Sequence, residues 1–334
     1  MMNNHKKLIS FAALVLALNL LPSANAEEKQ KGYFASDGKT MSEYGFDNKG
    51  ESSEKAIFAV NGKDNSGLPA NNARKTPAPS SNGISYNGGA VMTDAGGIKV
   101  NLIWYGTWND TQKSIVRTMV GGLSGSAYFN INTTYYDAAK NKIQNLVSIT
   151  SEFNDNYSQG NGSTKALTDA QIWNIVANAA TTSTAANSAI INPKVINLVL
   201  TSADVRKEGF LTSYCGWHNF TTAPGVAVKY GFIGNPGSNG ACNAQTGSSP
   251  NGDTGIDAMS SVIAHELEEA ATDPQLNAWY DGRGYENADK CSWTFGTTYK
   301  AANGSKANMK LGGKDYLIQR NWLNANGGLC TLSY

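Results

Sequence analysis

Residues 255–272 read GIDAMSSVIAHELEEAAT, and this stretch decides both the expected fold and the expected chemistry. Apolar residues recur along it at intervals of three and four, the spacing of one face of an α-helix. This apolar face consists of Met259, Val262, Ile263, Leu267, Ala270 and Ala271. Residues 234–253, which come before it, are rich in Gly, Asn and Pro and predict a loop. We therefore expect a helix over about residues 255–272, with its apolar side buried against a core.

The polar side of this helix carries the pattern His-Glu-x-x-Glu at residues 265–269. Residues four apart on a helix share a face, with Cβ atoms about 5–6 Å apart, so His265 and Glu269 are placed to bind one metal ion together. Glu266 is expected about 100° around the axis, at the rim. The arrangement is that of the zincin motif His-Glu-x-x-His with glutamate in place of the second histidine, and zinc accepts a carboxylate oxygen. Glu266 is then the predicted general base that activates water.

An acidic pair downstream supplies the further groups that a zinc site requires. Glu286 and Asp289 follow at a distance along the chain that allows a return over the helix. The predicted metal ligands are His265, Glu269, Glu286 and Asp289. Zinc is the predicted ion, and calcium or manganese is the alternative, because oxygen donors also suit these cations. Taken alone, the His-Glu-x-x-Glu pattern is weak, since a solvated acidic helix face carries the same residues.

Histidines are scarce in this chain, which has three, and His5 belongs to the N-terminal segment. His218 and His265 are left for any imidazole chemistry. If His218 approaches His265, it is either a further metal ligand or a donor to the oxyanion that develops on a substrate, and we group it with Glu266 as a catalytic candidate. The alternative is a buried imidazole bonded to backbone groups beside a disulfide, and the sequence does not separate the two.

Outside the helix, segments with strand and helix patterns alternate along the chain. A threonine and a glutamine at positions 168 and 171 have capping-box spacing, and Asp110 is a candidate cap for an earlier helix. The expected strands are residues 98–105, 129–136, 142–150, 195–200 and 316–322, and the expected helices besides 255–272 are residues 110–120 and 169–180. The predicted class is α/β or α+β, as a single mixed-sheet domain with a zincin-like active-site helix.

The N-terminal 26 residues have the features of a secretory signal peptide. Lys6 and Lys7 precede the apolar run Leu8–Leu21, and small residues follow at the expected cleavage site after Ala26. The run is about 14 residues, short of the roughly 20 that cross a bilayer, although a retained anchor is the alternative. We expect a secreted, extracellular protein with no membrane association after cleavage, or a periplasmic one if the source is Gram-negative. Residues 27–90 are rich in Gly, Ser, Asn, Lys and Pro and predict a poorly ordered leader or pro-segment, with the folded domain at 91–334.

Charge and cysteine content exclude several classes of function. The chain of 334 residues has 27 basic and 26 acidic residues, and removal of the signal peptide takes two lysines and no acid, so no basic surface for nucleic acid is expected. The four cysteines, Cys215, Cys242, Cys291 and Cys330, suggest two disulfides in an exported chain. Three pairings exist, and we favour the sequential one because each bond closes a moderate loop. A cysteine nucleophile is then not expected.

Several segments, in order along residues 90–331, resemble the phosphate-induced protein 1 (EXORDIUM-like) family. Around the helix these are Pro250–Met259, Ala264–Glu269, Asn277–Tyr280 and Glu286–Cys291. Elsewhere they are Ile103–Gly106 with Trp108, Tyr157–Gly160, Cys215–His218, and Leu317–Gln319 with Trp322. Each segment is short, but their common order makes the resemblance specific.

The resemblance implies a location more than a reaction. Plant members are exported proteins linked to growth and cell expansion, and no biochemical activity is established for them. The family pattern retains His218, His265, Glu266, Glu269, Glu286 and Asp289. Position 268 is not part of it, which favours Glu269 over Glu268 as a ligand. Asp273 falls where plant members tend to carry Asn, so a ligand role for Asp273 is in doubt. The family's extra cysteine pair is reduced here, so its disulfide scheme does not transfer as a whole.

Two functions remain as hypotheses. The first is a secreted zinc-dependent hydrolase with a peptide or a cell-wall polymer as substrate, and the zincin-like motif favours the peptide. The second is a non-catalytic extracellular or cell-wall-associated binding protein, in which the acidic cluster is structural or binds a hard cation. The sequence has no serine-hydrolase elbow, P-loop or dinucleotide fingerprint. Aromatic residues near the motif, Trp217, Trp279, Tyr280 and Tyr285, belong either to a core or to the floor of a cleft.

Overall fold

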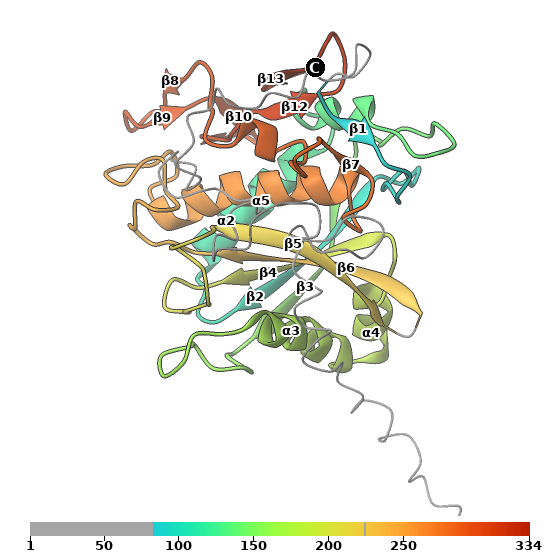
Figure 1. The fold of residues 1–334 in the computed structure, drawn as a ribbon. Helices are drawn as coiled ribbons and strands as arrows, with labels where there is room; N and C mark the ends of the chain where they lie inside the picture. Colours follow the sequence, from blue (N-terminus) through green and yellow to red (C-terminus); the bar gives the residue numbers. More distant parts are fainter. Residues whose placement is uncertain (1–82, 224) are drawn as a thin grey trace, which may run out of the picture.

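A five-stranded mixed sheet forms the centre of the molecule, in a computed structural model that describes residues 83–223 and 225–334 (Figure 1). Its strand order is β3-β2-β4-β6-β5. The first four strands in this order pair in parallel, and β5 pairs antiparallel with β6. The strands are β2 (Ile98–Tyr105), β3 (Val147–Asp155), β4 (Val195–Thr201), β5 (Gly216–Ala223) and β6 (Val226–Gly234). A mixed sheet in a chain of alternating helices and strands confirms the expected α+β architecture.

Helices cover both faces of this sheet. Figure 1 shows α2 (Asp110–Leu123) and α5 (Thr254–Thr272) on one face, and α3 (Asp169–Thr181) and α4 (Thr184–Ile190) on the other. All eight residues of β2 are buried except Lys99, which is half-buried, and all seven residues of β4 are buried. Two covered faces explain why these two strands are almost continuously apolar, as the sequence indicated.

A layer of short antiparallel strand pairs lies on the side of α5 that faces away from the sheet (Figure 1), and we call it the hairpin layer because most of these pairs are hairpins. Four antiparallel pairs form it: β1 (Ser85–Tyr86) with β7 (Trp279–Tyr280), β8 (Tyr299–Lys300) with β9 (Lys306–Ala307), β10 (Met309–Leu311) with β11 (Lys314–Tyr316), and β12 (Asn321–Leu323) with β13 (Leu329–Thr331). As a result α5 is buried all around, from Gly255 to Thr272. The sequence predicted only one buried side, because the helix alone does not reveal that a later segment covers its polar face.

The helix boundaries follow from caps that the sequence partly revealed. In α3, the Thr168 hydroxyl accepts from the Gln171 backbone N–H at 3.3 Å, and the Gln171 side-chain oxygen accepts from the Thr168 N–H at 3.1 Å, which confirms the predicted capping box. In α2 the cap is Asn109 and not Asp110, since Asn109 and Gln112 form a second capping box. The helix over residues 255–272 begins one residue earlier, at Thr254, with Asp253 as its cap.

Three expected strands differ from the structure. Residues 129–136 were expected as a strand but form the 3-10 helix η4 (Phe129–Thr134), where the Thr133 and Thr134 hydroxyls donate to carbonyls three residues back, at 2.8 and 2.7 Å. The strand expected at 142–150 starts only at Val147 and continues to Asp155. The strand expected at 316–322 is interrupted between β11 and β12, because the Gln319 backbone N–H turns to the Ser261 hydroxyl of α5 at 3.0 Å.

The folded domain begins before residue 91. Ser85 and Tyr86 pair with β7, and the Gly89 N–H donates to the carbonyl of Asn277 at 3.0 Å. Residues 83–90, assigned to the leader from their composition, are therefore part of the domain. The predicted signal peptide and the rest of the leader lie outside the described residues. Within the described ranges, no helix has the length and apolar character needed to span a membrane.

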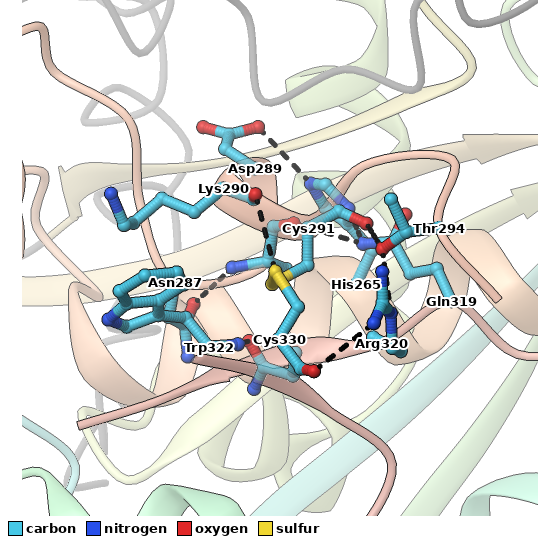
Figure 2. Close-up of a disulfide and its surroundings, with 12 residues drawn as sticks. His265, Asn287, Asp289, Lys290, Cys291, Thr294, Gln319, Arg320, Trp322 and Cys330 are labelled. Atoms are coloured by element: carbon cyan, nitrogen blue, oxygen red, sulfur yellow. Dashed lines mark hydrogen bonds and ion pairs between the residues drawn. A yellow bond between two sulfur atoms is a disulfide. The ribbon is translucent and has the colours of Figure 1, made fainter. Parts of the chain in front are cut away.

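Two disulfides form with the predicted sequential pairing. Cys215 is bonded to Cys242, and Cys291 to Cys330, so all four cysteines of the chain are in disulfides. The second bond joins the short 3-10 helix η5 (Asp289–Cys291) to β13, as Figure 2 shows. Structural disulfides of this kind are typical of proteins that fold outside the cytoplasm.

The capping box of α3 provides a test of the fold. Replacing Thr168 by Ala removes the acceptor for the Gln171 N–H, and we expect the free energy of unfolding to fall by about 1 kcal/mol. Thr168→Ser keeps a hydroxyl, so its free energy of unfolding should stay within roughly a few tenths of a kcal/mol of the wild-type value. Urea denaturation followed by circular dichroism measures both, and equal stabilities of the two variants would contradict the assigned cap.

Candidate metal centre

Six ionisable side chains from three separate segments meet on the buried polar side of α5. His265, Glu266 and Glu269 come from the helix itself, and His218 comes from β5. Glu286 and Asp289 come from the segment that returns over the helix and enters η5. These are His218, His265, Glu266, Glu269, Glu286 and Asp289, the six residues singled out from the sequence. The structure brings all of them together, and we call them the His/carboxylate cluster.

One half of the cluster is centred on His265. Its Nε2 lies 3.0 Å from Oε1 of Glu269 and 3.5 Å from Oδ1 of Asp289 (Figure 2 shows the contact with Asp289). One ligand atom from each of the three residues lies within 4.8 Å of the others. Donors bound to a tetrahedral zinc ion at about 2.0–2.1 Å are roughly 3.3 Å apart, so these separations fit the size of such an ion. Of the downstream acidic pair, Asp289 contacts His265, whereas Glu286 contacts His218.

The other half is centred on His218. Its Nδ1 lies 3.4 Å from Oε2 of Glu266 and 3.6 Å from Oε2 of Glu269, and these three residues form a second group of potential ligands. Its Nε2 faces Oε1 of Glu286 at 3.7 Å and the carbonyl of Asp273 at 3.4 Å. Glu266 was expected at the rim of the helix but is only 1% exposed, because β5 packs over it. Glu269 is therefore shared, with one oxygen toward each imidazole.

The acids of the cluster are buried without a full set of partners. Oε2 of Glu269 and Oε1 of Glu286 have no hydrogen-bond partner among the described residues, although both atoms are inaccessible to solvent. The ion pairs of the four carboxylates are formed with the two histidines. Burying an unpaired carboxylate oxygen is costly, so the arrangement favours a bound cation or retained protons.

Burial and mutual charge shift the pKa values in the cluster. Burial raises the pKa of Asp289 to about 7 and that of Glu286 well above its usual value. Burial opposes ionisation of Glu269 as well, but the charge and hydrogen bonds of the two histidines outweigh it and lower its pKa to about 2. Burial also disfavours charge on His218 and His265, yet the surrounding carboxylates hold both pKa values well above the usual range. Without a cation, the cluster therefore keeps protons that a metal ion would displace.

Neighbouring groups hold His265 and the segment that carries Asp289 in place. The side-chain amide of Gln319 contacts Nδ1 of His265, the ring nitrogen opposite the acids, and also donates to the Ala288 carbonyl at 3.3 Å. The Asp289 N–H donates to Oε1 of Glu269 at 3.0 Å. Gln319 belongs to the family-like segment Leu317–Gln319, but one polar residue in so short a run does not reveal its partner. A polar residue in a buried apolar run was the only signal available.

Two further acids beside the cluster have other partners. Glu268, adjacent to Glu269, is directed toward β12, where the Asn321 amide donates to it. Burial raises its pKa well above the usual value. Oδ1 of Asp273 accepts from the N–H groups of Asn277 and Ala278 at 2.6 and 2.7 Å. Neither residue belongs to the two ligand groups, in agreement with the doubts that the sequence raised about positions 268 and 273.

The aromatic residues near the motif pack mainly as core. Trp279 is 2% exposed and meets Tyr135 edge to face. Trp217 packs against Tyr230 and Phe232 of β6. Their indole rings are therefore engaged with the sheet and the hairpin layer, and the floor of a cleft is not the role that their contacts indicate.

The fold and the cluster together define an α+β protein whose central helix carries a buried His/carboxylate cluster, and comparison with known proteins gives the family. A family model described as "Phosphate-induced protein 1 conserved region" matches residues 84–319, which include the whole cluster and Gln319. The chain belongs to the phosphate-induced protein 1 family.

Similar proteins come from plants. Protein EXORDIUM-like 3 of Arabidopsis thaliana is 34% identical over 64% of this chain and 70% of its own length. Protein EXORDIUM-like 5 of the same plant is 29% identical over 74% of this chain and 77% of its own length. Protein PHOSPHATE-INDUCED 1 of Nicotiana tabacum is 27% identical over 60% of this chain and 67% of its own length. No solved structure matches the chain.

The pKa shifts predict how stability depends on pH when no metal is bound. Between about pH 4 and 7 the folded protein keeps protons on Asp289 and Glu286 that the unfolded chain releases. Above about pH 6.5 the folded protein also keeps protons on His218 and His265 that the unfolded chain releases. A folded state that binds more protons loses stability as pH rises. The pKa of Glu269 is shifted in the opposite direction, to about 2, and this shift affects stability only below about pH 4.5.

We therefore expect that chelator-treated protein has a lower free energy of unfolding at pH 8 than at pH 5. Added zinc should reduce this difference, because metal binding displaces the protons and becomes tighter as pH rises. Urea denaturation at several pH values, with and without zinc, measures both effects. Greater stability of the metal-free protein at pH 8 than at pH 5 would contradict the charge states assigned to the cluster.

Proposed function

We propose that this protein is an exported, zinc-dependent hydrolase that acts on peptides. One observation carries the proposal: His265, Glu269 and Asp289 converge in a buried site with separations that fit a zinc ion, while Oε2 of Glu269 has no hydrogen-bond partner within the described residues. A buried carboxylate oxygen without a donor favours a cation nearby. The signal-like N-terminal segment and the two disulfides support export, to the extracellular space or to the periplasm of a Gram-negative source.

In this proposal each cluster residue has a distinct role. His265, Glu269 and Asp289 would hold the ion, and a zinc ion bound there would polarise a substrate carbonyl and ease the ionisation of water. Glu266 would take a proton from the attacking water and pass it to the leaving group. Burial raises the pKa of Glu266 above its usual value, which suits a general base at neutral pH. His218, 3.4 Å from Glu266, would position that carboxylate.

A second candidate function is favoured by the depth of the cluster. His265 and Glu269 are fully buried, and Glu286 is only 6% exposed. Such burial also suits a structural cation in a non-catalytic extracellular protein that binds a peptide or a cell-wall polymer. Oxygen-rich ligation would then equally suit calcium or manganese. The two candidates differ in one measurable respect, since only the hydrolase needs Glu266 for turnover.

The metal site can be tested with two neighbouring glutamates. Glu268 and Glu269 are both fully buried in α5, but only Glu269 contacts the histidines. We expect protein purified without added metal to contain about one zinc ion or more per chain. Glu269→Gln should lower the zinc content at least about tenfold, because an amide is a poor zinc ligand. The matched control Glu268→Gln should retain it. Elemental analysis of the three proteins decides, and equal zinc content in both variants would contradict the assignment.

The catalytic role can be tested by Glu266→Gln, which keeps the size of the side chain and removes the base. We expect the variant to retain the zinc ion held by His265, Glu269 and Asp289, while hydrolysis of a peptide library falls about 100-fold or more. Mass spectrometry of the cleaved peptides provides the measurement. Bound metal without hydrolysis in the wild type would favour the non-catalytic candidate. A variant as active as a hydrolysing wild type would contradict the role of Glu266 as the base.

A further inference from the structure

We propose that the cluster binds a second divalent cation beside the first, held by Nδ1 of His218 and Oε2 of Glu266, with Glu269 as the bridging ligand. The inference rests on the proposed function, since it takes the ion at His265, Glu269 and Asp289 as the first of the pair. It assigns a ligand role to His218 and a second role to Glu266. The protein would then be a hydrolase with a pair of metal ions and not a single-ion zincin.

The two oxygens of Glu269 support a bridge. Oε1 is already engaged, at 3.0 Å from Nε2 of His265 and 3.0 Å from the Asp289 N–H. Oε2 points to the other half of the cluster, 3.6 Å from Nδ1 of His218, and has no hydrogen-bond partner within the described residues. An ion on the His265 side would satisfy Oε1 and leave Oε2 buried without a partner. A second ion between Oε2 of Glu269 and His218 would give this buried oxygen a partner.

The surroundings of His218 favour metal binding through Nδ1. Its Nε2 faces two acceptors, the Asp273 carbonyl at 3.4 Å and Oε1 of Glu286 at 3.7 Å. These acceptors favour the tautomer with the proton on Nε2. The lone pair on Nδ1 is then directed at carboxylate oxygens of Glu266 and Glu269, 3.4 and 3.6 Å away. A positive charge is needed between Nδ1 and these two anionic oxygens, and a cation would supply it in place of the proton that the metal-free cluster keeps there. An imidazole fixed by an acceptor at its other nitrogen is the usual form of a metal ligand.

Charge balance gives an independent argument for two ions. The cluster contains four carboxylates, Glu266, Glu269, Glu286 and Asp289, and two imidazoles that are neutral when they bind metal. One divalent cation leaves two negative charges in a site from which solvent is largely excluded, whereas two divalent cations balance all four. Pairs of cations about 3.5–4 Å apart are used by hydrolases to stabilise the attacking and leaving oxygens together. The donor set, carboxylates and imidazoles, suits zinc or manganese.

Metal counting with Mn²⁺ as the probe tests the pair. The full-length mature protein is treated with chelator, dialysed against Mn²⁺ and analysed for metal content and by electron paramagnetic resonance. We expect two Mn²⁺ per chain with a spin-coupled signal, since the bridged ions are close. His218→Ala should bind one Mn²⁺ with an uncoupled six-line signal, because the ligands of the first ion are intact. Glu268→Gln should keep two coupled ions, and circular dichroism checks that each variant is folded.

The outcomes separate this inference from the function on which it rests. One ion in both the wild type and His218→Ala would overturn the pair and leave the single-ion hydrolase intact. No bound ion in the wild type would overturn both. Two ions in His218→Ala would place the second ion elsewhere and contradict the inference. If His218→Ala does not fold, the wild-type spectrum alone decides, since two uncoupled ions exclude a bridge through Glu269.

Discussion

The burial of a charged helix face is the constraint on which the rest of the structure depends. In α5, residues 255–272 are buried throughout, and the acids Glu266, Glu268 and Glu269 are each no more than 1% exposed. Such acids remain ionised in the interior only if histidines, donors or cations compensate them. The neighbouring segments supply these groups, which explains why the helix, β5 and the return segment around Asp289 form one unit.

The layered architecture follows from the two different sides of this helix. Val262 and Glu266 lie against β5 of the sheet, whereas Ser261, His265 and Glu268 face the C-terminal hairpins. Those hairpins bring polar groups inward, including Gln319 to His265 and Asn321 to Glu268. The Cys291–Cys330 disulfide joins the turn after Asp289 to the last strand (Figure 2). The hairpin layer therefore completes a site that the sheet and helix begin.

Local signals in the sequence were enough to predict much of the fold, and contacts between distant residues explain the rest. The capping box at Thr168 and the apolar run of β4 depend on neighbouring residues, so both were predicted. The run at Phe129 has strand propensity, but threonine hydroxyls that bond to nearby carbonyls favour a 3-10 helix there. The spacing of His265 and Glu269 predicted a shared site. The position of Glu266 under β5 and the contact of Gln319 with His265 could not be predicted, because each joins two segments that are far apart in the sequence.

Anomalous X-ray scattering from crystals of zinc-loaded protein would show directly whether an ion binds in the His/carboxylate cluster. We expect a peak at the zinc edge between Nε2 of His265, Oε1 of Glu269 and Oδ1 of Asp289, in the interior next to α5. A density map without any anomalous peak in the cluster, with the carboxyl groups of Glu269 and Asp289 bonded only to protein donors, would contradict it. The burial of these acids would then be compensated by protons alone.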